Sequence, residues 1–116
     1  MTDTNISFYL KHDRIHVFVD ALRRIGSPHR ICFMMSDDGN RLMVSPYTKR
    51  DLKSHIVPAE TYQGDGGLEI SSYKLCHLIA GMQNWDNERS YRIPGTVYED
   101  RQVAVFDLKK AEIIER

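Results

Sequence analysis

An antiparallel hairpin is predicted by the stretch Arg30-Ile31-Cys32-Phe33-Met34-Met35-Ser36-Asp37-Asp38-Gly39-Asn40-Arg41-Leu42-Met43-Val44-Ser45. Two apolar runs, 30–35 and 41–45, flank a polar centre, where Asp38-Gly39 supplies the positive φ that a tight turn needs. A turn explains this acidic centre without calcium, because the alternating ligands and distant glutamate of a calcium loop are missing. Both faces of the first run are apolar, so we expect this strand to lie inside a sheet or at an interface.

Upstream of the hairpin, the hydrophobic period changes from two to that of a helix. Alternation over 6–10 predicts a strand. The next apolar residues follow a helical spacing and predict a helix over about 13–25, with Asp13 as N-cap and Gly26 at its end. The apolar face of this helix would consist of Ile15, Phe18, Val19, Leu22 and Ile25.

Downstream of the hairpin, the pattern predicts a second helix followed by a second hairpin. Residues 48–53 are a polar, basic connection, residues 54–70 fit either strands or a long loop, and 68–70 are a short strand candidate. The second helix is capped by Ser71 or Ser72 and ends near Trp85. Its core face would consist of Leu75, Leu78, Ile79 and Met82. Strands are predicted over 90–98 and 102–108, and the charged end 109–116 can extend the last one.

These elements predict one α+β domain over residues 1–116, with two helices packed on a mainly antiparallel sheet. The chain has 116 residues, and its 41% hydrophobic and 28% charged content is typical of a globular domain. Sixteen basic residues balance sixteen acidic ones. A net charge near zero argues against strong autonomous binding to a polyanion, and it lowers the barrier to self-association.

Cys32 and Cys76 each lie in an apolar run, and we expect both to be buried as small hydrophobic residues. Two distant cysteines form neither a disulfide framework nor a metal motif, which favours a reducing compartment. The first residues lack the pattern of a signal peptide, and no apolar run is long enough to span a membrane. The sequence therefore predicts a cytoplasmic location and no membrane association.

No recognisable catalytic, metal or cofactor site follows from the sequence. His12 and His16 are four residues apart, but the glutamate of a zinc-protease motif is missing, so we interpret them as surface histidines. The glycines of 64–67 lack a phosphate-loop lysine and indicate a flexible loop. These observations argue against an enzyme. The alternative is a small enzyme whose site assembles from scattered residues, including Cys76 and His77.

The order of elements resembles one domain of the bacterial DNA sliding clamp. The resemblance rests on Phe8-Tyr9-Leu10 leading into 15–25, the hairpin 31–45, Val57-Pro58-Ala59 before the helix 72–83, and the hairpin 96–108. In that family, domains join edge to edge into a ring whose helices surround DNA. The resemblance implies that four residues would face DNA: Arg14, Arg23, Arg24 and Lys74. Because a clamp chain contains several such domains and this chain contains one, a ring would require a homo-oligomer.

Our leading hypothesis from the sequence is a non-enzymatic binding and assembly domain that self-associates by pairing edge strands. If the domain is clamp-like, it would also associate weakly with DNA. A protein-interaction module is a further alternative, and it would require an exposed apolar patch. Five aromatic residues near element ends fit either the edge of the core or an interface. They are Tyr47, Tyr62, Trp85, Tyr91 and Tyr98.

Overall fold

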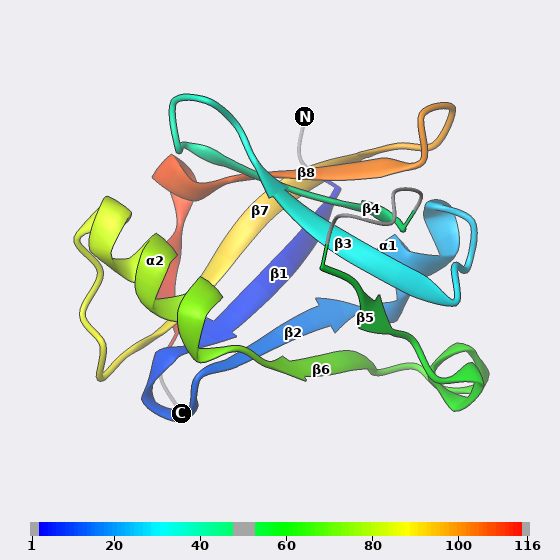
Figure 1. Cartoon of the computed structure of the whole chain (residues 1–116), viewed down its shortest axis with the longest axis horizontal. Helices are drawn as coiled ribbons and strands as arrows, with labels where there is room; N and C mark the ends of the chain where they lie inside the picture. The colour runs from blue at the N-terminus through cyan, green and yellow to red at the C-terminus, as the bar shows by residue number, and fades with distance from the viewer. Residues whose placement is uncertain (1–2, 48–52, 115–116) are drawn as a thin grey trace.

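The computed structural model describes residues 3–47 and 53–114, and within them nine strands form one antiparallel sheet. Its order is β5-β3-β4-β8-β7-β1-β2-β6, and β9 also pairs with β7. The sheet curls until it is nearly a barrel (Figure 1). The strands are β1 (Thr4–Tyr9), β2 (Arg14–Phe18), β3 (Arg30–Met35), β4 (Arg41–Pro46), β5 (His55–Ile56), β6 (Gly67–Ser71), β7 (Ser90–Tyr98), β8 (Val103–Asp107) and β9 (Glu112–Ile114).

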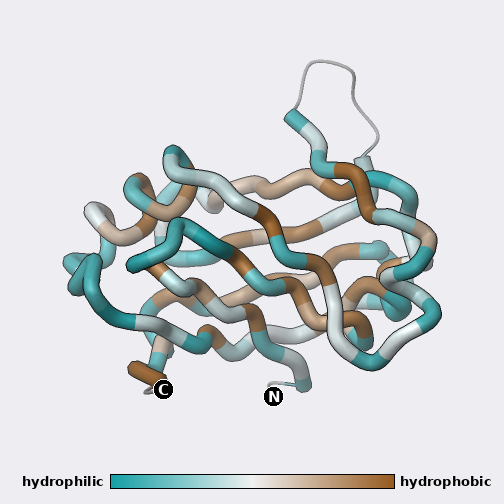
Figure 2. Tube along the Cα trace, turned by 90° about the horizontal axis from the view of Figure 1, so that it is seen from below, coloured by the Kyte–Doolittle hydropathy of each residue, from teal (hydrophilic) through white to brown (hydrophobic). Residues whose placement is uncertain are grey.

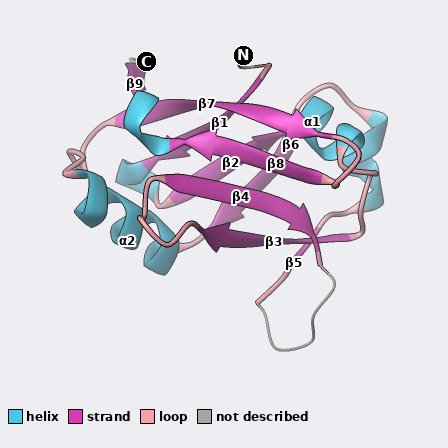
Figure 3. Cartoon of the chain, turned by 90° about the horizontal axis from the view of Figure 1, so that it is seen from above, coloured by secondary structure: helices cyan, strands magenta, loops and turns pink. Residues whose placement is uncertain are grey.

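Two α-helices lie at opposite ends of this curled sheet (Figures 1 and 3). They are α1 (Val19–Arg24) and α2 (Tyr73–Gln83), and three short 3-10 turns accompany them: η1 (Leu10–His12), η2 (Ala59–Gln63) and η3 (Leu108–Lys110). Hydrophobic positions gather along the strands, whereas the peripheral turns are mostly hydrophilic (Figure 2). The inward side chains form one core, which includes the fully buried Phe8, Leu22, Ile93 and Phe106. The expected mixed fold with a mainly antiparallel sheet is therefore present.

The β3–β4 hairpin is confirmed. Asp38 closes its turn, because its Oδ1 accepts hydrogen bonds from the Ser36 hydroxyl at 2.7 Å and from the Asn40 N–H at 3.0 Å. The Ser36 hydrogen bond is the main reason that the pKa of Asp38 lies below its ordinary value. Gly39 has φ +73°, as this turn requires.

The single helix predicted over 13–25 is wrong. Residues Arg14–Phe18 form β2, and only Val19–Arg24 are helical. Asp13 is not an N-cap; it has φ 54° and redirects the chain from η1 into β2. The segment is a strand because Ile15 and Val17 alternate with outward side chains, and β2 pairs with β1 on one side and β6 on the other.

The second helix is confirmed in its extent, but its buried face is not the predicted one. The Ser72 hydroxyl caps α2 by accepting a hydrogen bond from the Leu75 N–H. Leu78 and Met82, expected in the core, are 53% and 44% exposed. The buried positions besides Ile79 are the smaller Cys76, which was expected to be buried, and Ala80, which was expected off the core. The reason is that α2 lies close to β2 and η1, and small side chains allow that approach.

The structure also defines the two parts of the chain that the sequence left open, residues 54–70 and the segment that follows β8. Residues 54–70 contain β5, η2 and β6, so the short strand expected at 68–70 is confirmed, while residues 48–52 of the basic connection lie outside the described residues. The end of the chain does not simply lengthen β8. The chain leaves β8 through η3 and returns as β9, which pairs with the first residues of β7.

One edge of β7 pairs with two different strands along its length. Its residues 90–92 pair with β9 and its residues 95–98 with β8, while β1 pairs along 90–95. Pro94, which has no N–H to donate, lies between the segments bonded to β9 and to β8. Gly95 is buried against Phe106, and a Cβ at this position would lie 2.4 Å from the Phe106 ring and 2.6 Å from the Val105 carbonyl oxygen. Only glycine allows the strands to approach this closely.

Candidate functional site

The outer face of the sheet divides into two halves of different chemistry, which meet along β7. Five apolar side chains occupy the middle of the outward side of β3, β4, β8 and the end of β7, and the polar Arg41, Ser45, Thr96 and Asp107 lie on the same side. The register places Met34 opposite Met43, Met43 opposite Val105, and Val105 opposite Thr96. In the neighbouring row, Val103 lies opposite Tyr98. We call Met34, Met43, Tyr98, Val103 and Val105 the apolar outer face.

The apolar outer face is open to solvent. Met34 is 37% and Tyr98 is 45% exposed, and the other three members are half-buried. The helices contact chiefly β1, β2 and β6 and lie at the two ends of the sheet, so they leave this half uncovered (Figure 3). A shallow hollow of about 160 Å³ lies beside Tyr98 and Val105. Its charged rim consists of Arg41, Asp107 and Lys110.

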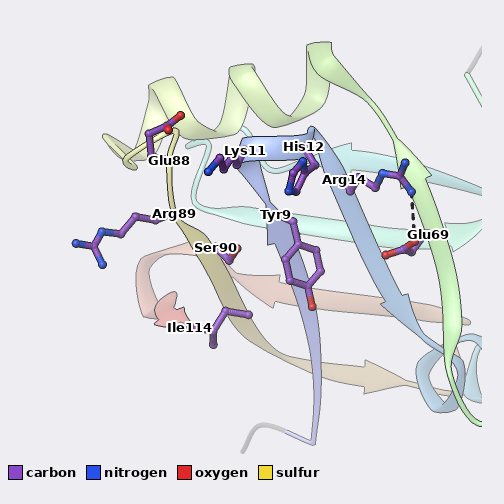
Figure 4. A pocket seen from close by; sticks show the side chains of 9 residues that line it. All are labelled: Tyr9, Lys11, His12, Arg14, Glu69, Glu88, Arg89, Ser90 and Ile114. Carbon is purple, nitrogen blue, oxygen red and sulfur yellow. Dashed lines mark hydrogen bonds and ion pairs between the residues drawn. The ribbon is translucent and has the colours of Figure 1, made fainter. Parts of the chain in front are cut away.

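The other half of the outer face, which we call the polar outer face, carries charge. One row crosses four strands from Arg92 to Ser7 to His16 to Glu69. Beside this row lies a cavity of about 670 Å³ (Figure 4). Its lining residues come from η1, five strands and the turn before β7: Tyr9, Lys11, His12, Arg14, Glu69, Glu88, Arg89, Ser90 and Ile114.

Ion pairs partly balance the charges around this cavity. Arg14 Nη1 lies 3.4 Å from Glu69 Oε2, and both side chains are about half exposed, at 51% and 52%. Arg89 Nε lies 3.7 Å from Asp86 Oδ2. Lys11 and His12 are exposed, and neither forms an ion pair or hydrogen bond within the described part of the chain. The cavity therefore retains free cationic and N–H donor capacity beside η1.

The structure does not bring the four proposed DNA-facing residues together. Arg14 lines the cavity, whereas Arg23 donates hydrogen bonds to the carbonyl oxygens of Tyr62 and Gly64 at 2.9 and 2.8 Å. Lys74 is exposed on α2, at the far end of the sheet from α1 (Figure 1).

Arg24, the fourth of these residues, is held by two carboxylates. Its guanidinium lies 3.1 Å from Asp3 Oδ2 and 2.9 Å from Glu99 Oε1. The hydrogen bond to Asp3 and then that to Glu99 raise the pKa of Arg24 above its ordinary value. The same Arg24 hydrogen bond is the main cause of the lowered pKa of Asp3.

Cys76 lacks the accessible thiolate that nucleophilic catalysis requires. The side chain is fully buried, and burial together with the nearby Asp13 raises the pKa of its thiol to about 12. The neighbouring His77 faces elsewhere: it stacks on Tyr73 at 3.9 Å, and its Nε2 lies 3.2 Å from Asp13 Oδ1. Cys32 is also buried, so the expectation for both cysteines is confirmed.

The two histidines considered as metal ligands lie on different elements, and the aromatic residues divide between the core edge and the surface. His12 belongs to η1 and His16 to β2, and residues 3–47 and 53–114 contain no group of three His, Cys, Asp or Glu side chains placed to hold a metal ion. Trp85 and Tyr91 stack at 4.5 Å and pack at the edge of the core. Tyr98 remains exposed on the apolar outer face.

Sequence reasoning did not identify Met43, Val103 or Val105 as surface residues. The only signal was the two-sided apolar character of 30–35, because the outward direction of the other strands depends on a register that the sequence does not show. None of the described helices has the length and hydrophobicity to span a bilayer. Comparison with protein-family models, with curated proteins and with solved structures found no match for this chain.

Proposed function

We propose that this chain is a binding and assembly domain that associates with a second copy of itself through the apolar outer face. The observation that carries the proposal is the row Met34–Met43–Val105, which points away from the core on a half of the sheet that no described helix covers. Outward positions of an antiparallel sheet are normally polar when they face water. An apolar row at such positions is typical of a surface that becomes buried on association.

The composition of this surface fits a protein interface. Interfaces are enriched in tyrosine and methionine at their centre and carry a polar rim. Here Tyr98 supplies an exposed aromatic anchor, and the flexible Met34 and Met43 can adapt to an opposing surface. Burying such side chains contributes roughly 25 cal/mol per Å² of apolar area.

The charges around the apolar outer face favour a second copy as the partner. The rim contains Arg41 and Lys110 but also Asp107, so a twofold arrangement can place Arg41 of one copy beside Asp107 of the other. The chain has no net charge, and two copies therefore do not repel each other strongly.

Face-to-face association is better supported than pairing of edge strands. The sheet has short edges in β5, with two residues, and in β9, with three residues that pair only with β7. Its other edge is β6, which presents the exposed Glu69 near its middle. Short edges and outward charges are typical devices against edge-to-edge pairing. The apolar outer face has neither protection.

Light scattering at two salt concentrations tests this proposal with matched variants. We expect a dimer that persists at high salt, because apolar contacts are not screened. Met43→Lys should give a monomer, whereas Met43→Leu should leave the dimer intact. Circular dichroism would verify that both variants fold. A wild-type monomer at high concentration, or a dimer that survives Met43→Lys, would overturn the proposal.

A further inference from the structure

The cavity on the polar outer face has the size and donors of a small-molecule site. Its volume of about 670 Å³ lies within the range of ligand pockets, roughly 300–1,000 Å³. It lies on strands β1, β2 and β6 and beside the start of β7, away from the apolar outer face. We propose that it binds a small phosphate monoester that carries hydroxyl groups, such as a sugar phosphate.

Three N–H donors at one side of the cavity would hold the phosphate. Lys11 and His12 project from η1, and the left-handed Asp13 then turns the chain so that Arg14 begins β2 beside the same hollow. Figure 4 shows Lys11, His12 and Arg14 in a row along this side, with Arg14 turned toward Glu69 and Arg89 directed away from the cavity. A phosphate accepts short, charge-assisted hydrogen bonds from such donors.

Arg14 can bind the phosphate while it keeps its ion pair with Glu69. The Arg14–Glu69 contact is 3.4 Å long and uses one nitrogen, Nη1. A guanidinium has five N–H donors in a planar fork, so the remaining donors can bind an incoming oxygen. Glu69 then acts as a positioning residue that holds Arg14 at the cavity.

The acidic residues select the class of phosphate ligand. Glu69 and Glu88 both line the cavity, together with the hydroxyl of Ser90. A nucleic-acid backbone that crossed the cavity would bring its repeated negative charges toward these carboxylates. A small monoester places one charged group beside Lys11, while its hydroxyls donate to the carboxylates. Sugar phosphates have this combination of groups.

Isothermal titration of the full chain with ribose 5-phosphate tests this site. We expect binding of ribose 5-phosphate, weaker binding of inorganic phosphate and no binding of ribose. Lys11→Gln and Arg14→Gln should each raise the Kd about tenfold, since each removes a charge-assisted hydrogen bond. Lys53→Gln is the matched control, because Lys53 is also exposed but does not line the cavity, and its Kd should equal that of the wild type.

A further variant separates the two parts of the site. Glu88→Gln should weaken binding of ribose 5-phosphate without weakening that of inorganic phosphate. No heat of binding at millimolar ligand, equal affinities for ribose 5-phosphate and inorganic phosphate, or unchanged binding by Lys11→Gln would each overturn the proposal. Tighter, salt-sensitive binding of a single-stranded oligonucleotide would overturn it in favour of a nucleic-acid surface.

Discussion

The two halves of the outer face belong to one sheet, yet they present different surfaces to water. On the polar half, Arg92, Ser7, His16 and Glu69 follow one another across the strands, and all of them except the fully buried Ser7 are accessible to water. On the apolar half, the corresponding row contains Met34, Met43 and Val105. The inward side chains of both halves belong to one hydrophobic core. Folding requires the apolar inward side in both halves, whereas it places no such requirement on the outward side, so the two outward surfaces can differ in their chemistry.

The largest expected effect comes from the boundary between the halves, at Gly95. Gly95→Ala should lower the free energy of unfolding by about 3 kcal/mol, because the new Cβ meets the backbone oxygen of Val105, which cannot move aside easily. Urea denaturation measures this change. Gly81→Ala is the matched control on the exposed side of α2, where the added Cβ meets nothing within 4 Å. It should stabilise the helix by about 0.5–1 kcal/mol. A neutral Gly95→Ala would show that the two halves are less tightly joined than the structure indicates.

The two buried cysteines allow the cost of a serine substitution to be compared at an inward position, Cys76 of α2, and at an outward position on the apolar half, Cys32 of β3. Cys76→Ser should cost about 2 kcal/mol, because it places a hydroxyl in the core. Cys32→Ser should cost less than about 1 kcal/mol, since Cys32 Sγ already lies 3.5 Å from the Ser45 hydroxyl, which can pair with a serine. Thermal unfolding of the two variants tests the order. Equal losses of stability in the two variants would mean that a hydroxyl at Cys32 is as unfavourable as one in the core.

The smallest effect concerns Asp3, whose Oδ1 accepts a hydrogen bond from Val97 N–H and whose Oδ2 binds Arg24. Because the folded protein lowers the pKa of Asp3, this carboxylate stabilises the fold above its unfolded pKa. The stabilisation is lost as the pH falls below about 4, through the folded pKa. Arg24→Gln should therefore be slightly less stable than the wild type at neutral pH and nearly equal at low pH. A gap that widens on acidification would contradict this assignment.

The sequence predicted those elements whose pattern is local. The Asp38-Gly39 turn is present, and the strand predicted over 6–10 is β1, which ends at Tyr9. The strands predicted over 90–98 and 102–108 are β7 (Ser90–Tyr98) and β8 (Val103–Asp107). The segment 14–18 was misread because Ile15, Phe18 and Leu22 fit a helical period as well as Ile15 and Val17 fit a strand. Pairing with β1 and β6 decided between them, and β6 lies some fifty residues away along the chain.

The candidate sites were less accessible to sequence reasoning than the fold. The apolar outer face depends on the register of β3, β4, β8 and β7, which sets the direction of each side chain. The cavity joins residues near positions 10, 69, 89 and 114, which no local pattern connects. Arg14 alone was already a candidate, and DNA contact by Arg14, Arg23, Arg24 and Lys74 stays a prediction.

The central place of β1 has a consequence for how the domain is made. β1 precedes the other described strands in the chain, yet its Ser7 pairs with Arg92 of β7, far along the sequence. β1 and β2 can form a hairpin early, but a two-stranded hairpin is only marginally stable in water. The sheet becomes continuous only after β8, which joins β4 to β7, has been synthesised. Until then the apolar inward sides of β1 and β3 lack their partners across the sheet, and such exposed apolar strands favour aggregation of an incomplete chain.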